Sequence, residues 1–155
     1  AAPDGVVGFE CGADVVTEYV NQPDRPGARW HTNHPVATVA LEDGEAIGTS
    51  GDYQRYFEVD GKRYPHLLDP RTGYPADHTQ AVTVLIPGGA KAGTRSDAAS
   101  KPIFIAGPDA WRAMARKMEI GLVLRFDRDN RVFVSEALRP RLEFVGEHPE
   151  IIVVP

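Results

Sequence analysis

Glycine and proline interrupt this chain so often that long, uninterrupted helices are disfavoured. The 155 residues include 15 glycines and 13 prolines. Proline lacks the amide hydrogen that a helix interior needs, and both residue types favour turns. This spacing favours short strands joined by turns over a helical bundle. The length suits one domain with a substantial core and is short for two, so we expect residues 1–155 to form a single domain.

The clearest local signal is a β-hairpin within "RYFEVDGKRYPHLLD" (residues 55–69). Two runs with alternating apolar residues flank Asp60-Gly61, a dipeptide that favours a two-residue hairpin turn. The segment before it predicts a strand at 36–41, the turn "EDGE", and a short strand that ends on "TSG" (49–51).

Three further segments predict strands. The continuous β-branched run "AVTVLI" (81–86) predicts a strand that is covered on both faces. "GLVLRF" and "RVFVSE", separated by "DRDN", predict a last hairpin before a tail interrupted by proline. Near the start, "VVGFECGADVV" (6–16) predicts a strand, a glycine turn and a further strand or helix start.

Two helices are expected. "SDAASKPIFIAG" predicts a helix that is capped by Ser96 or Asp97 and ends near Gly107, with a kink or a later start caused by Pro102. "DAWRAMARKM" (109–118) predicts a second, amphipathic helix. The expected fold class is therefore α+β, with a largely antiparallel sheet and two packed helices.

Composition excludes several classes of protein. The formal net charge is −5 and no basic cluster is present, which argues against a nucleic-acid-binding surface. No apolar run approaches the length of a membrane span. A single cysteine, Cys11, excludes an internal disulfide framework and a multi-cysteine metal site.

The segment "HLLDPRTGYP" (66–75) supports two interpretations. Histidine as a residue type can act as a base for a nearby hydroxyl, and His66 lies close in sequence to Asp69 and Arg71. The same letters also describe an ordinary turn, because Pro70 fixes one backbone dihedral and Gly73 permits a positive one.

Asp97 likewise has a structural and a functional interpretation. An aspartate at a helix start caps the helix and complements its dipole. Lys101 lies four residues later on the same helix face, so the two side chains are also placed to form an ion pair.

Taken in order, several of these segments resemble one family. "GTSGDYQRYFEVDGKRYPHLLDPRTGYP", "AVTVLIP", "SDAAS" and "FIAG" resemble the C-terminal half of the FAD:protein FMN transferases. This is the ApbE-type flavin transferase family, first described as thiamine-biosynthesis lipoproteins. "CGAD" (11–14) is similar to the family's glycine-glycine-aspartate turn, with Ala13 in place of one glycine. The resemblance runs from about Cys11 to Gly107.

The resemblance implies a function and a set of site residues. The family cleaves FAD at its pyrophosphate, transfers FMN to a threonine hydroxyl of a partner protein and releases AMP, usually with Mg²⁺. By this resemblance His66 is the candidate catalytic base, and Asp97 matches the metal-binding aspartate. The implied flavin-binding residues are Thr49, Ser50, Gly51, Leu68, Asp69, Arg71, Thr72 and Gly73. The resemblance also implies half of a flavin-transferase fold and a periplasmic or otherwise exported location.

This sequence departs from the family in two ways. Family members are about twice as long, and the glycine-isoleucine-alanine-lysine-glycine segment of their N-terminal half does not occur here, so we expect another chain to complete the site in a hetero-oligomer. The threonine expected four residues after Asp97 is Lys101, and a protonated amine cannot ligate Mg²⁺. Two alternatives to an active flavin transferase therefore stay open: a flavin-binding or carrier module without catalysis, and a structural partner of a catalytic chain.

Overall fold

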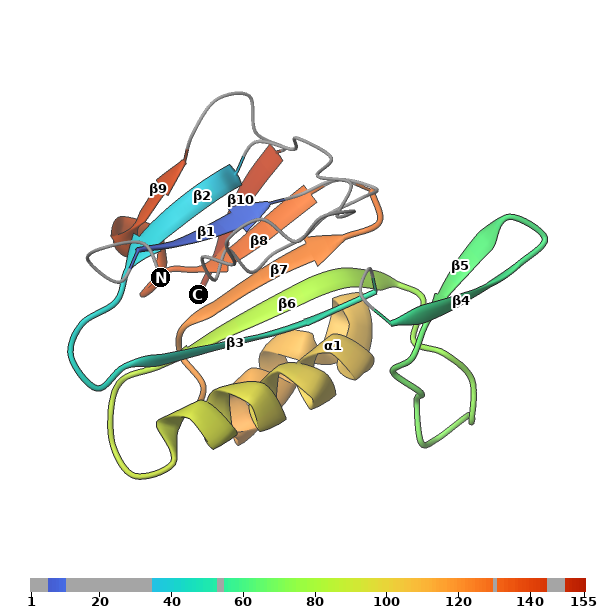
Figure 1. The fold of residues 1–155 in the computed structure, drawn as a ribbon, viewed down its shortest axis with the longest axis horizontal. Coiled ribbons are helices and arrows are strands. Elements are labelled where there is room, and N and C mark those ends of the chain that lie inside the picture. The colour runs from blue at the N-terminus through green and yellow to red at the C-terminus, as the bar shows by residue number, and fades with distance from the viewer. Residues whose placement is uncertain (1–5, 11–34, 53–54, 130, 145–149) are drawn as a thin grey trace, which may run out of the picture.

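The computed structural model describes residues 6–10, 35–52, 55–129, 131–144 and 150–155 (Figure 1). The regular elements, in chain order, are β1 Val6–Glu10, β2 Pro35–Ala40, β3 Ala46–Gly51, β4 Tyr56–Val59, β5 Lys62–Pro65, β6 Thr79–Ile86, α1 Ala92–Lys117, β7 Val123–Asp127, β8 Arg131–Ser135, a 3₁₀ turn η1 Arg139–Arg141, β9 Leu142–Phe144 and β10 Glu150–Val154.

Three layers make up the body of the molecule. A five-stranded sheet with the order β10-β8-β7-β6-β3 lies in the middle. Helix α1 packs against β3 and β6 on one face of this sheet, and the three-stranded sheet β1-β2-β9 lies on the other side (Figure 1). The α+β class expected from the sequence is confirmed at this level.

Strand β6 separates two hydrophobic clusters and contributes to both. Val82, Val84 and Ile86 pack toward α1, where Ile103, Phe104 and Trp111 are also buried. Ala81 and Leu85 pack on the opposite face with residues of β2, β7 and β8. Successive residues of a strand point to opposite faces, so a strand buried on both faces needs the continuous apolar run that this segment has. The prediction for 81–86 is confirmed.

The hairpin predicted around Asp60-Gly61 is also confirmed. Strands β4 and β5 pair antiparallel, with Val59 opposite Lys62. The two turn residues have positive φ, 51° at Asp60 and 74° at Gly61, as a type I′ turn requires. The hairpin forms a separate two-stranded sheet that projects from the body of the molecule (Figure 1).

The helical region agrees with the two expected helices at their boundary and differs at the start. Within α1 the backbone leaves helical geometry at Gly107, where the first helix was expected to end, so two helical segments lie on either side of this residue. The element begins at Ala92 rather than at Ser96 or Asp97. Ser96 is buried in its first part, and its hydroxyl donates to the carbonyl of Gly93 rather than capping the helix end. The element continues through Pro102, and the irregularity comes at Gly107, where φ is 76° and ψ is −174°.

The C-terminal part contains strands that the sequence pattern did not reveal. The hairpin of β7 and β8 is confirmed, but β9 and β10 lie in the segment for which the sequence predicted an irregular tail. β10 pairs parallel with β8, whereas the other described pairings are antiparallel. The predicted first strand matches β1, while the turn at 11–14, including Cys11, lies outside the described residues. Within the described residues, no helix is long and apolar enough to cross a membrane.

Candidate functional site

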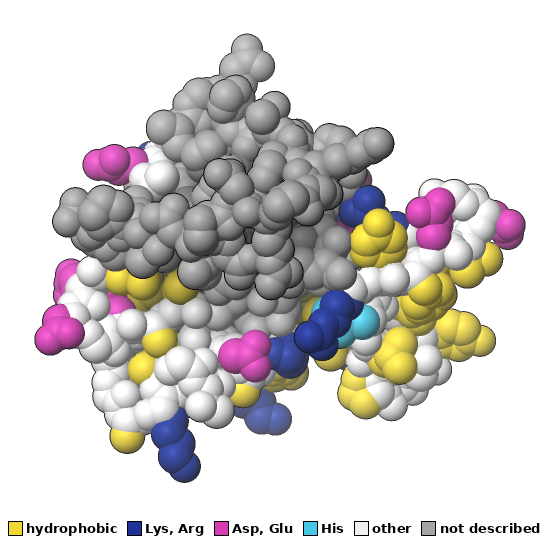
Figure 2. Space-filling model, in the orientation of Figure 1, with side chains coloured by type: hydrophobic (Ala, Val, Ile, Leu, Met, Phe, Trp, Pro, Cys, Tyr) yellow, Lys and Arg dark blue, Asp and Glu magenta, His cyan; other side chains and the backbone are white. Residues whose placement is uncertain are grey.

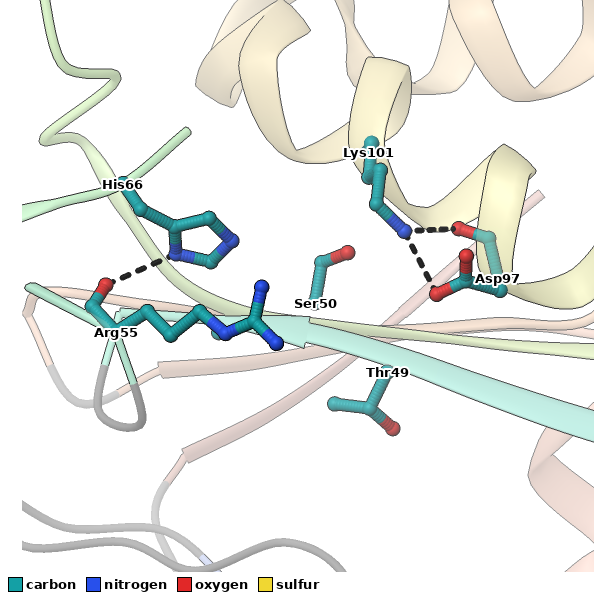
Figure 3. A pocket seen from close by; sticks show the side chains of 7 residues that line it. Thr49, Ser50, Arg55, His66, Asp97 and Lys101 are labelled. Carbon is teal, nitrogen blue, oxygen red and sulfur yellow. Dashed lines mark hydrogen bonds and ion pairs between the residues drawn. The ribbon is translucent and has the colours of Figure 1, made fainter. Parts of the chain in front are cut away.

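A polar pocket of about 340 Å³ lies where the end of β3 meets α1 (Figure 3). Three separate segments line it: the end of β3, the residues that flank the β4–β5 hairpin, and the first half of α1. Its lining residues are Thr49, Ser50, Gly51, Arg55, His66, Asp97 and Lys101. Five of the predicted site residues and Lys101 are thus brought together from positions up to fifty-two residues apart.

The close contact between β3 and α1 depends on Gly48. A Cβ atom at this position would lie 2.5 Å from the main-chain carbon of Ser96 and 2.6 Å from the nitrogen of Asp97. Real Cβ atoms do not approach a main chain so closely, so only glycine lets the strand lie against the helix here. This contact carries Ser50, two residues further on, to the side of α1 that holds Asp97.

Buried hydroxyl groups connect the strand to the helix. The Ser100 hydroxyl donates to the Asp97 carbonyl oxygen at 2.8 Å, and its oxygen is 2.7 Å from Ser50 Oγ. Ser100 has one hydroxyl hydrogen, which goes to Asp97, so Ser50 must donate to Ser100. Ser50 therefore has no hydrogen left for an anionic ligand. Thr49 points to the other face of β3, where its Oγ1 is 2.9 Å from Thr83 Oγ1 (Figure 3).

The orientation of His66 follows from one carbonyl oxygen. His66 Nδ1 lies 2.9 Å from the carbonyl oxygen of Arg55, which also accepts the main-chain N–H of His66 at 3.1 Å. A carbonyl oxygen only accepts, so Nδ1 must carry the hydrogen. In the neutral ring the lone pair is then on Nε2, the nitrogen that faces the pocket (Figure 3). This is the tautomer that a base for a bound hydroxyl requires.

Lys101 and Asp97 form the ion pair that their spacing predicts. Lys101 Nζ lies 2.7 Å from Asp97 Oδ1 and 2.9 Å from the Asp97 carbonyl oxygen (Figure 3). With Arg55, the lining carries two positive charges and one negative charge. This balance suits an anionic ligand.

The donor set does not fit a divalent metal ion. The pocket lining contains one carboxylate, and that carboxylate already accepts from an ammonium group. Within the part of the chain that the structure describes, no cluster of three or more His, Cys, Asp or Glu side chains is placed to hold a metal. Asp97 therefore lies in the pocket as predicted, while the Mg²⁺ site that the resemblance implied lacks its second ligand.

The predicted residues of the 68–73 loop do not line this pocket. Leu68, Asp69, Arg71, Thr72 and Gly73 form a closed turn in which Asp69 N–H donates to the Tyr74 carbonyl oxygen and Gly73 N–H to that of Asp69. Their predicted contact with flavin stays a prediction.

Arg71 holds the Asp69 carboxylate inside this turn. Arg71 donates through its main-chain nitrogen and Nε, both at 2.9 Å, and through Nη2 at 2.6 Å. The Arg71 side chain, followed by its main-chain N–H, lowers the pKa of Asp69 to about 2. The carboxylate is therefore ionised at any pH near neutrality.

Two residues that shape the pocket were not singled out from the sequence. Arg55 lies within the segment that carries the resemblance, and its side chain extends between His66 and Ser50 (Figure 3). Gly48 precedes "TSG" directly. A glycine inside a strand signals close backbone approach, and this signal was present in "AIGTSG".

Comparison with known proteins agrees with the resemblance. The model of the ApbE family matches residues 12–124. An FAD:protein FMN transferase of Rhodobacter capsulatus is 36% identical over 156 residues, which covers 97% of this chain and 28% of the relative. One from Haemophilus influenzae is 40% identical over 112 residues, covering 72% of this chain and 30% of the relative.

A solved structure gives the same assignment. The ApbE protein of Thermotoga maritima superposes with a TM-score of 0.61 at 36% identity, over 72% of this chain and 35% of that one. The chain therefore spans about a third of the length of the proteins that it matches.

Proposed function

The chain belongs to the ApbE family, and from this premise we propose that its pocket holds the pyrophosphate of FAD in a flavin transferase. One observation carries the proposal. Three distant segments of the family-matching region, at Thr49–Gly51, His66 and Asp97, converge on one polar pocket. A pyrophosphate carries negative charge at neutral pH, and a lining with Arg55 and Lys101 offers it charge-assisted hydrogen bonds.

In this proposal His66 is the catalytic base. The oxygen of an acceptor threonine attacks the FMN phosphorus, its hydroxyl proton passes to His66 Nε2, the pyrophosphate P–O bond breaks, and AMP leaves. The hydrogen bond from Nδ1 to the Arg55 carbonyl holds the ring with Nε2 toward the pocket. Arg55 and Lys101 stabilise the charge that develops on the phosphate oxygens.

The site needs residues beyond these 155. The chain spans about a third of the relatives' length, and the described pocket offers no apolar surface large enough for an isoalloxazine ring. We propose that the part of the family fold outside these residues, on the same or on a second polypeptide, supplies the rest of the flavin site and that a separate acceptor protein receives the FMN. Export to the periplasm belongs to the same proposal and is tested by fractionating cells that express the native gene.

Substitution of His66 tests the proposed function. In the assembled protein, supplied with FAD and acceptor, His66→Ala should slow FMN transfer by about 100- to 10,000-fold, the usual contribution of one general base. Transfer is measured by flavin fluorescence of the acceptor and by AMP release. The thermal midpoint should stay almost unchanged, because the His66 side chain is exposed.

His78 provides the contrast. Its ring lies 3.0 Å from the position of a Cβ on Gly107 and bonds to Thr79 Oγ1, so His78→Ala should lower the thermal midpoint and leave the chemistry of bound FAD intact. Full transfer by His66→Ala would exclude it as the base.

A second function is favoured by the Lys101–Asp97 pair. Without a divalent ion the pocket keeps charge for binding but lacks the stronger stabilisation that phosphoryl transfer usually requires. A flavin-binding or carrier module would bind FAD and release no AMP in the assay above. A structural partner subunit would bind no FAD at all.

A further inference from the structure

We infer that the Lys101 ammonium is the resident cation of this pocket, so that the pocket binds a pyrophosphate group without a divalent metal ion. The inference concerns the charge chemistry of the site and rests on the proposed function for the identity of its natural ligand, FAD.

The Lys101 ammonium contacts two oxygens of Asp97. Lys101 Nζ lies at hydrogen-bond distance from both Asp97 Oδ1 (2.7 Å) and the Asp97 carbonyl oxygen (2.9 Å). The same carbonyl oxygen also accepts from the Ser100 hydroxyl at 2.8 Å. A divalent ion bound at Asp97 Oδ1 would have to displace the ammonium from that oxygen and would then lie beside a positive charge.

The ion pair is an exposed i,i+4 pair on the helix, with the Lys101 side chain 40% and the Asp97 side chain 69% exposed, but it has two additional features. Such pairs form between two charged side chains and contribute little. Here the ammonium also donates to a main-chain carbonyl, and it lines a pocket together with Arg55 and His66. An ammonium has three donors. Two of them are directed to Asp97, which leaves one for an oxygen of a ligand in the pocket.

The neighbouring groups direct this third donor toward an anion. The Ser50 hydroxyl is already hydrogen-bonded to Ser100, whose own hydrogen goes to the Asp97 carbonyl oxygen. The Arg and Lys side chains of the lining are Arg55 and Lys101. Arg55 lies on the hairpin side and Lys101 on the helix side, so a phosphate oxygen between them meets a positive charge from each side (Figure 3).

Calorimetry on the complete assembled protein tests the inference. Binding of inorganic pyrophosphate and of FAD is measured in EDTA and in millimolar Mg²⁺. The native protein should bind pyrophosphate equally well in both buffers. Lys101→Thr should bind at least about tenfold more weakly in EDTA, the loss expected for one charge-assisted hydrogen bond, and should recover affinity when Mg²⁺ is added. Lys101→Arg should keep binding in EDTA.

Lys117→Thr is the matched control, because it removes an exposed lysine from the last turn of the same helix, outside the pocket lining. Three outcomes would overturn the inference. The native protein binds pyrophosphate only with Mg²⁺, it binds no pyrophosphate at all, or Lys101→Thr and Lys117→Thr bind it equally well in EDTA. Metal-independent binding of pyrophosphate without binding of FAD would support the resident cation and refute the proposed flavin function instead.

Discussion

Asp69 and Arg71 show how one residue pair fixes a loop beside the site. The Asp69 side chain is 11% exposed, and that of Arg71 is 68% exposed. The carboxylate is thus turned inward and the guanidinium closes over it from the solvent side, with Pro70 and Gly73 setting the turn. The turn interpretation of "DPRTG" is confirmed. A structural role for Asp69 follows, whether or not the rest of the loop contacts flavin.

The pair makes the loop sensitive to acid. The folded state lowers the pKa of Asp69 from 3.8 to about 2, so the ionised carboxylate stabilises the loop above pH 3.8. This contribution declines as the pH falls from 3.8 through about 2. Arg71→Ala should raise the pKa of Asp69 only part of the way to 3.8, because the main-chain N–H of residue 71 still donates to Oδ1. Carboxyl carbon chemical shifts measure the titration, with Arg112→Ala as an exposed control; an unchanged Asp69 titration in Arg71→Ala would refute the assignment.

At the scale of elements, the packing of β3 on α1 positions the pocket. Gly48→Ala places a methyl carbon 2.5 Å from the Ser96 main chain, so either the strand or the helix must move. We expect a loss of about 1–3 kcal/mol in the free energy of unfolding, as for overpacked cores, together with weaker ligand binding as Ser50 and Asp97 separate. Urea unfolding measures the first effect.

Gly93→Ala is the control for Gly48→Ala. Gly93 is exposed in the first turn of α1, and apart from its chain neighbours and the adjacent helix backbone no atom lies within 4 Å of the position that its Cβ would take, so alanine there should stabilise the helix by about 0.5–1 kcal/mol. Equal stability of Gly48→Ala and the native chain would show that the contact is not tight.

Elements with a local signal were predictable from the sequence, and elements defined by distant pairing were not. The β4–β5 hairpin and β6 follow from turn chemistry and a β-branched run. The predicted helix start was wrong because the chain enters α1 through Lys91 at φ 63°, without a side-chain cap and without an acidic residue in the first turn. β10 was missed because it pairs in parallel with β8, so no hairpin turn joins the two strands. The prolines before β10 also favoured an irregular tail.

The same distinction applies to the site. The family resemblance identified "TSG", His66 and Asp97 because each is part of a residue string. Three other features depend on how the folded segments meet. They are the contact of Lys101 with both the carboxylate and the carbonyl of Asp97, the Ser50–Ser100 hydrogen bond and the tautomer of His66. A linear sequence specifies residue types and spacing; hydrogen-bond direction depends on which acceptors the fold brings near.

At the scale of the whole molecule, apolar side chains gather at one end. Phe57 is 49%, Leu68 52% and Tyr74 75% exposed, and in Figure 2 hydrophobic side chains gather at this end of the molecule, below the acidic tip of the projecting hairpin. A two-stranded hairpin is marginally stable by itself, and exposed clusters of this kind are typical of contact surfaces. We therefore propose that the polypeptide that completes the flavin site covers this end.

Two substitutions at that end should separate assembly from folding. Phe57→Ser with Leu68→Ser should leave the unfolding midpoint of the chain nearly unchanged, because about half of each side chain is already exposed. Assembly with the completing polypeptide should weaken by at least about tenfold, since each of the two substitutions removes roughly 1 kcal/mol of apolar burial. Val153→Ser is the control: Val153 is 48% exposed on β10, at the opposite edge of the five-stranded sheet. Sedimentation velocity measures the assembly. A stable monomer that binds FAD at an equimolar ratio without a second polypeptide would contradict both the proposed contact surface and the proposal that the flavin site is incomplete in this chain.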